Sequence, residues 1–250
     1  KSGDFYNEEL LYKTFGVQAE LLIDHAWGWE PCTIADIRAY RPDSNSISSG
    51  QVLQEPYDWH KAKLIVREMT DLLVLDLVKK RLCTDQLTLT IGYDIENLSD
   101  PARAAEYAGE THVDRYGRRV PKHGHGTANL AGYSSSTREI TDAVMALYDR
   151  ITDKNLLVRR VTVAANRVLP ENKIPRAAES GEQMDLFSAA EEKPCAPGAE
   201  QKARERERRR QEAILAIQRR YGSNAILKGM NLEEGATTRE RNKQIGGHRA

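Results

Sequence analysis

Side chains that suit contact with a phosphate backbone recur in separated parts of the chain. Residues 46–50 read SISSG, and the small hydroxyl side chains of Ser46, Ser48 and Ser49 leave backbone N–H groups open to an anion. Arg159 and Arg160 adjoin in LLVRRVTV. Adjacent strand residues point to opposite faces, so one of these arginines lies on the open face and the other reaches around an edge or sits at a bulge.

Thr88 and Thr90 belong to the alternating stretch QLTLTIGYD and are expected to share the open face with one of the arginines. An arginine flanked by Thr and Ser on a strand suits contact with the backbone of a duplex. An ordinary solvated sheet face is the competing interpretation, and the formal net charge of zero favours it. Any grip on DNA would therefore be weak and reversible, with a shallow dependence on salt.

No stretch of the sequence predicts a self-contained active site. His123 and His125, with His112 nearby, could hold a metal, but HGH lies in a glycine-rich loop without acidic or thiol partners at ligand spacing, so a polar loop is expected. Asp24 and His25 are expected at the surface of a short helix. No nucleophile elbow, phosphate-binding loop or dinucleotide fingerprint occurs.

Residues 181–188, GEQMDLFS, are unusual because apolar side chains interrupt a Pro-, Ala- and Glu-rich stretch that reads as disordered. Chance is one interpretation. The other is a short peptide that docks into a pocket of another protein.

Hydrophobic spacing predicts an α+β fold. Two short helices are expected over residues 7–28. A βαββαβ domain follows, with two helices on one face of a four-stranded antiparallel sheet. Asp58 is the expected N-cap of the first long helix, and Ser136 with Glu139 forms an expected capping box for the second. The predicted strands are 46–53, 86–94, 126–135 and 156–169, and the predicted helices are 58–82, 137–151 and 201–228.

The sequence divides into five expected parts: a helical region 1–40, a linker 41–45, the βαββαβ domain 46–170, a disordered linker 171–200, and a basic helix with a polar tail 201–250. Residues 95–126 are a long insertion within the domain. The three cysteines are far apart, which fits a reducing compartment. No apolar run spans a membrane, so a cytoplasmic, membrane-free protein is expected. The chain begins at Lys1, which favours a fragment or a processed chain.

Three stretches, in this order, carry a resemblance to a known family: LLYKTFGVQAELLIDHAWGWEPCTI, SISSGQVL and LLVRRVTV. With them the chain resembles the C-terminal half of bacterial Y-family translesion DNA polymerases, in the branch of polymerase IV and the UmuC-type UV-repair proteins. The closing stretch AILAIQRRYGSNAILKGMNLEEGATTRERNKQIGGH is similar to tails of this branch. The resemblance implies the end of a thumb domain in residues 1–40 and a little-finger domain in 46–170. It leaves the insertion uncovered.

In that family the open sheet face contacts template–primer DNA. The resemblance carries this role over to the serines Ser46, Ser48 and Ser49, to Arg159 and Arg160 and, more weakly, to Arg167. The family also implies that Gln183-Met184-Asp185-Leu186-Phe187 binds the bacterial β sliding clamp, with Leu186 and Phe187 as anchors and Met replacing a leucine. No cofactor is expected in this chain. The Mg²⁺ ions of the full polymerase are held by palm carboxylates, which have no counterpart here.

Two rival functions stay open. One is a non-catalytic accessory protein that binds DNA and the clamp without an attached polymerase. The other is a ferredoxin-like domain that binds RNA or a small ligand, although only Tyr93 and Tyr133 could stack bases, and Tyr93 falls on the buried side. The basic helix at 201–220 could contact DNA or a recombinase-type repair protein, or simply be solvated.

Overall fold

The computed structural model describes residues 8–40, 45–114, 117–174, 197–245 and 248–249. The chain forms two compact units, residues 1–43 and residues 44–250, and each is described by itself. Among the described residues, no helix is both long and apolar enough to cross a membrane.

The first unit contains three short helices, α1 (Glu8–Phe15), α2 (Gln18–Ala26) and α3 (Ile34–Ala39). The first two match the expected helices. The third begins where Thr33 accepts a hydrogen bond from the Asp36 N–H, while the Asp36 carboxylate accepts one from the Thr33 N–H at 2.9 Å. This reciprocal cap fixes the start of a helix too short for its spacing to be recognised in the sequence.

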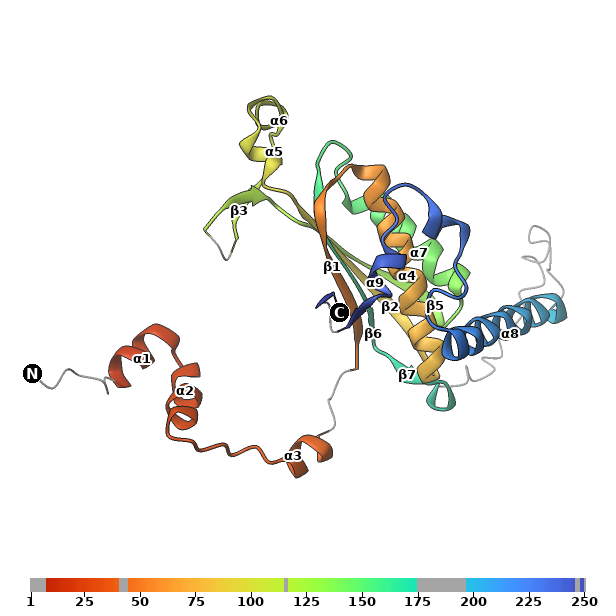
Figure 1. Cartoon of the computed structure of the whole chain (residues 1–250), viewed down its shortest axis with the longest axis horizontal. Coiled ribbons are helices and arrows are strands. Elements are labelled where there is room, and N and C mark those ends of the chain that lie inside the picture. The colour runs from red at the N-terminus through yellow and green to blue at the C-terminus, as the bar shows by residue number, and fades with distance from the viewer. Residues whose placement is uncertain (1–7, 41–44, 115–116, 175–196, 246–247, 250) are drawn as a thin grey trace, which may run out of the picture. The chain divides into compact units, whose positions relative to one another are not determined.

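The second unit contains the predicted βαββαβ domain, and Figure 1 shows α4 and α7 together on one side of its sheet. Its main elements are β1 (Ile47–Tyr57), α4 (Trp59–Lys80), β2 (Leu82–Tyr93), β5 (Gly124–Ser134), α7 (Thr137–Ile151) and β6 (Val158–Asn166). The strands are antiparallel in the order β1-β6-β2-β5, and the short β7 (Leu169–Pro170) pairs with the start of β2. The predicted fold class is therefore confirmed.

Alternating side chains of the strands and the apolar stripes of the helices form the core. Leu87, Leu89 and Ile91 of β2 are fully buried, as their alternation predicts, and Ile65 and Val144 meet them from α4 and α7. Each such side chain contributes about 1.5–3 kcal/mol when buried. The core thus lies on one side of the sheet, and the other side is left to solvent.

Both long helices begin at capping residues. The Asp58 carboxylate accepts a hydrogen bond from the Lys61 N–H at 2.8 Å, as expected. Ser136 likewise accepts from the Glu139 N–H, but the predicted capping box is only half formed, because the Glu139 carboxylate lies 3.4 Å from Arg204. A charged partner on another helix competes for the carboxylate that would otherwise complete the cap.

The insertion between β2 and β5 is ordered rather than a plain loop. It contains α5 (Glu96–Ser99), α6 (Pro101–Glu106), and a small hairpin of β3 (Thr111–Val113) and β4 (Arg119–Pro121). Figure 1 shows this hairpin projecting beyond one end of the main sheet.

The C-terminal segment packs onto α4 through α8 (Pro197–Tyr221), η2 (Gly229–Leu232) and Thr237, instead of forming only a helix and a free polar tail. The other elements of this segment are α9 (Thr238–Arg241), β8 (Gln244–Ile245) and β9 (His248–Arg249). A 3₁₀ turn, η1 (Glu171–Lys173), lies earlier in the chain, directly after β7. Polar groups make this docking possible. The Glu68 carboxylate, 1% exposed, accepts hydrogen bonds from Asn231 Nδ2 at 2.7 Å and the Thr237 N–H at 2.8 Å.

Candidate nucleic-acid interface

Small polar side chains line the side of the sheet opposite α4 and α7, here called the open face. Pairing places four strands' residues in rows across it. One row is Ser48, Ala164, Thr88 and Thr127, and the next is Gly50, Thr162, Thr90 and His125. These short side chains allow a flat ligand to approach the sheet closely.

Hydrogen bonds between neighbouring strands order the open face. Thr90 Oγ1 lies 2.9 Å from His125 Nδ1, and Asn166 Nδ2 donates to Thr88 Oγ1 at 2.7 Å. Tyr93, by contrast, is buried on the other side, and its hydroxyl accepts a hydrogen bond from the Asp153 N–H at 2.9 Å. It therefore cannot stack a base, which removes one of the two aromatic candidates for RNA binding.

The adjacent arginines are placed by an irregularity in β6. Gly92 of β2 pairs with Arg160, whereas Tyr93 pairs with Val158, so Arg159 is an extra residue in the ladder. Such a bulge turns a side chain away from the strict alternation. Both arginines consequently line the same groove on the open face, as the bulge alternative in the sequence allowed.

Arg159 and Arg160 differ in their surroundings. Arg159 Nε lies 3.6 Å from the Asp94 carboxylate, whereas Arg160 is exposed and makes no ion pair within the described part of the chain. Gly92 lies directly beside Arg160, and a Cβ there would come within 3.1 Å of the Arg160 Cβ. Arg160 is thus the cation most available to an anion on the open face.

The three predicted serines do not share one environment. Ser48 is exposed in the first row of the open face, and Ser46 is exposed just before β1. Ser49 pairs with the buried Val163 and faces the helices, where its Oγ accepts a hydrogen bond from Arg241 at 3.2 Å. Because neighbouring strand residues point to opposite faces, Ser48 and Ser49 cannot share one face. Ser49 therefore cannot contact a ligand on the open face.

Arg167, the weaker prediction, lies after β6 in the left-handed region with φ of 50°. Its Nε donates to the Asp85 carboxylate at 2.8 Å and its Nη2 to Asn129 Oδ1 at 3.3 Å. It therefore closes the end of the sheet with its own partners, although its half-exposed side chain still borders the open face.

The three histidines lie in a row rather than around a common centre. The ring centroids of His112 and His123 are 5.6 Å apart, and those of His123 and His125 are 6.3 Å apart. Burial and the neighbouring His112, His125 and Lys122 lower the pKa of His123. No group of three or more His, Cys, Asp or Glu side chains suited to a metal ion occurs among the described residues.

Two further predicted features belong to other parts of the sequence. His25 contacts Glu30, with Nε2 2.6 Å from Oε2, and does not form an acid–base pair with Asp24. The predicted clamp-binding residues, Gln183, Met184, Asp185, Leu186 and Phe187, lie outside the described residues.

Several open-face residues were not predicted. His125, Thr127 and Asn129 alternate along β5 as its exposed side chains, and Asn166 ends β6. The period-two pattern of HGHGTAN was the available signal, but its glycines made the stretch read as a weaker strand.

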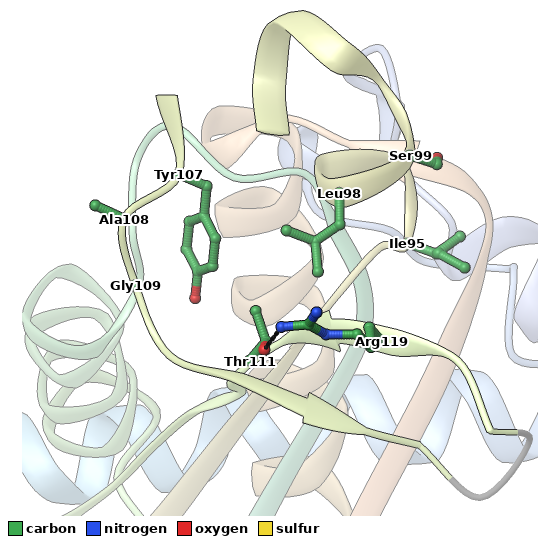
Figure 2. A pocket seen from close by; sticks show the side chains of 8 residues that line it. All are labelled: Ile95, Leu98, Ser99, Tyr107, Ala108, Gly109, Thr111 and Arg119. Carbon is green, nitrogen blue, oxygen red and sulfur yellow. Dashed lines mark hydrogen bonds between the residues drawn. The ribbon is translucent and has the colours of Figure 1, made fainter. Parts of the chain in front are cut away.

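A small cavity of about 530 Å³ lies between the insertion's helices and the outer side of its hairpin. Figure 2 shows Tyr107, Leu98 and Ile95 around it, and Arg119 across it, donating to Thr111 Oγ1 at 3.0 Å. The residues that line it include one cation, three hydroxyl side chains and no carboxylate.

The open face thus offers hydroxyls, amides and a bulged arginine. Comparison with known families identifies the domain more closely. Residues 44–186 match the C-terminal domain of the impB/mucB/samB family, and the chain belongs to that family. The resemblance to the C-terminal domain of Y-family polymerases is thereby confirmed.

Among solved structures, the chain is similar to a complex of the beta-clamp processivity factor and the little finger domain of PolIV. The TM-score is 0.32 at 10% sequence identity, over 48% of this chain and 86% of that chain. No curated protein matches the chain.

Proposed function

We propose that this chain is the DNA-gripping and clamp-tethering part of a translesion DNA polymerase that acts in the bypass of damaged DNA, within the SOS response. In this proposal residues 1–40 are the end of the thumb, residues 41–45 the linker, and residues 46–170 the little finger. The open face lies along template–primer duplex and contacts its phosphate backbone.

The availability of the open face carries this proposal. In the second unit, α4 and α7 cover one side of the sheet, while Arg160, Ser48 and the Thr88–Thr127 row stay accessible on the other. Backbone contacts of this kind position a duplex without reading its sequence. A polymerase that must accept damaged templates needs that indifference to sequence.

The grip is expected to be weak. Arg159 is already beside Asp94, and Arg167 is paired with Asp85, so few cations are free to neutralise phosphates. Each phosphate contact contributes a slope of about −0.9 to the dependence of log K on log salt concentration. Two or three contacts therefore predict a slope of roughly −2 to −3.

The clamp tether rests on Gln183–Phe187 as a sequence motif. Burying Leu186 and Phe187 in a clamp pocket would contribute about 1.5–3 kcal/mol each before the cost of ordering the peptide. A weak contact with DNA and a weak contact with the clamp, joined in one chain, raise the effective concentration at the primer end. The basic helix α8 is a candidate for contact with DNA or a recombinase-type protein.

Nucleotidyl transfer itself is proposed to belong to a palm domain, whose carboxylates would hold Mg²⁺. The described residues contain no cluster that fits such ions, so no catalytic step is assigned to this chain.

The test is fluorescence anisotropy of a labelled primer–template duplex titrated with the chain, for wild type, Arg160→Ala and Arg67→Ala. Arg67 is exposed on α4, on the helix-covered side, so it matches the change in charge. Arg160→Ala should weaken binding about three- to tenfold and reduce the salt slope by about one. Arg67→Ala should leave the affinity within twofold. Equal losses in both variants would show that only net charge matters and would overturn the open face as the site.

A further inference from the structure

A groove of about 1020 Å³ lies between the open face and the inner side of the β3–β4 hairpin. Thr90, Arg160 and Thr162 line it from the sheet, and His112 and His123 line it from the insertion. The groove therefore continues the open face beyond the end of the sheet, and the insertion supplies its second wall.

The hairpin borders two separate cavities, and some of its residues line only one of them. On β3, His112 faces the groove, while Thr111 lines the separate small cavity. Arg119 of β4 also faces that cavity, where Figure 2 shows it bonded to Thr111. The two sides of one hairpin thus carry different groups, which allows each side to be tested alone.

Of the three acidic side chains that line the groove, those of Asp94 and Asp114 are already engaged, whereas Glu96 is exposed and makes no ion pair within the described part of the chain. The Asp94 carboxylate accepts a hydrogen bond from the Glu96 N–H at 2.8 Å and lies beside Arg159. The Asp114 carboxylate accepts hydrogen bonds from Arg118 Nε at 2.9 Å and Nη2 at 2.7 Å. Arg160 and the histidines are consequently the donors that the groove offers to a ligand, and Glu96 is the one carboxylate there without an ion pair among the described residues.

These groups follow a line. Thr90 contacts His125, and the row continues from His125 to His123 and His112. The ring centroids of successive histidines are 6.3 and 5.6 Å apart. A row of donors beside a small residue such as Gly92 suits an extended anion more than a compact one. The groove is open and lacks a buried polar pocket, which a small-molecule ligand would need for its orientation.

We propose that the β3–β4 hairpin is a second wall of the nucleic-acid interface, and that the groove holds the phosphate backbone of one DNA strand where the duplex passes the end of the sheet. This inference rests on the proposed contact of the open face with DNA. It assigns a role to the insertion, residues 95–126.

The test compares three variants by anisotropy with the same primer–template duplex. His112→Ala/His123→Ala removes two donors from the groove side, Arg119→Ala changes the opposite side of the hairpin, and Arg160→Ala reports the open face itself. The histidine double variant should bind about three- to tenfold more weakly than wild type at pH 6.5, and Arg119→Ala should stay within twofold. Circular dichroism and thermal melting verify that each variant is folded.

A fourth variant replaces residues 110–122 with a short Gly-Ser linker and should lose at least as much affinity as the histidine double variant. If Arg160→Ala weakens binding but the histidine double variant and the shortened chain bind like wild type, the hairpin is no part of the interface, while the open-face proposal stands. If wild type does not bind the duplex, both proposals fail. A loss in Arg119→Ala equal to that of the histidines would also overturn the groove.

Discussion

Asn231 Nδ2 donates a hydrogen bond to Glu68 Oε1 at 2.7 Å, and both side chains are buried. This contact joins α4 to a segment 163 residues later in the chain. The Thr237 N–H donates to the second oxygen of the same carboxylate. A buried charge is thus satisfied by neutral donors from the C-terminal segment, which ties that segment to the second unit.

Glu68→Ala is expected to destabilise the second unit by about 1–3 kcal/mol, because Asn231 and the Thr237 N–H would lose their acceptor. Urea unfolding followed by circular dichroism measures this change. Glu55→Ala is the matched control, since Glu55 is exposed on β1. A midpoint equal to that of wild type would mean that the C-terminal segment does not depend on this contact.

Tyr148→Phe is expected to cost about 1 kcal/mol without changing the fold. The Tyr148 hydroxyl donates to the Trp59 carbonyl at 2.8 Å and links α7 to the start of α4, and burial raises the pKa of Tyr148. The variant removes only the oxygen and keeps the buried ring. Thermal melting of Tyr148→Phe beside Tyr12→Phe, an exposed tyrosine of the first unit, measures the effect.

The affinity for DNA is expected to rise as the pH falls from 7.5 to 6. The pKa of His123 is lowered in the free protein by burial and by His112, His125 and Lys122, so the ring is mostly neutral near pH 7. A phosphate beside it would favour the protonated ring and raise that pKa, so binding takes up a proton. Lys122 is paired with Glu110 at 2.6 Å, and both stay charged over this range.

Isothermal titration in two buffers of different ionisation enthalpy measures this proton uptake. His123→Gln should bind DNA with a smaller dependence on pH than wild type. The idea that His123 lies beside a phosphate would be abandoned if the two proteins had the same dependence.

Leu186→Ala/Phe187→Ala is expected to abolish binding of the chain to an immobilised bacterial β clamp, since both anchors of the predicted peptide are removed. Ser188→Ala is the matched control, as it changes the adjacent position of the same segment. Micromolar binding of wild type and the control, lost in the double variant, is the expected result. Equal binding by all three proteins would reduce QMDLF to a chance run of apolar residues.

Much of the domain could be predicted because its pattern is local. The alternation of Leu87, Leu89 and Ile91 fixes which side of β2 is buried, and Asp58 marks the start of α4. The open face then follows, since Thr88 and Thr90 must point the other way. For the same reason Ser49 could have been excluded, because it neighbours Ser48 in an extended strand.

The rest depended on contacts between distant residues. Glu68 and Asp71 interrupt the apolar face of α4, and only their pairing with Asn231 and Lys228 shows that a polar segment covers them. The bulge at Arg159 depends on its register with Gly92, which no single strand reveals. The β3–β4 hairpin has strands of three residues each, too short for a period to be recognised.

Arg208 contacts the Glu171 carboxylate with two guanidinium nitrogens, so the middle of α8 is held close to η1. Gln211 anchors the same helix by donating to the Ser135 carbonyl and to Thr137 Oγ1, each at 3.0 Å. η1 and α8, which flank residues 175–196 in the chain, are therefore held to one body. A single proteolytic cut within this segment would release neither half of the chain, because α8 would stay attached by its own contacts. A clamp that bound at Gln183–Phe187, as proposed above, would likewise be connected to the domain through the chain on both sides of the motif.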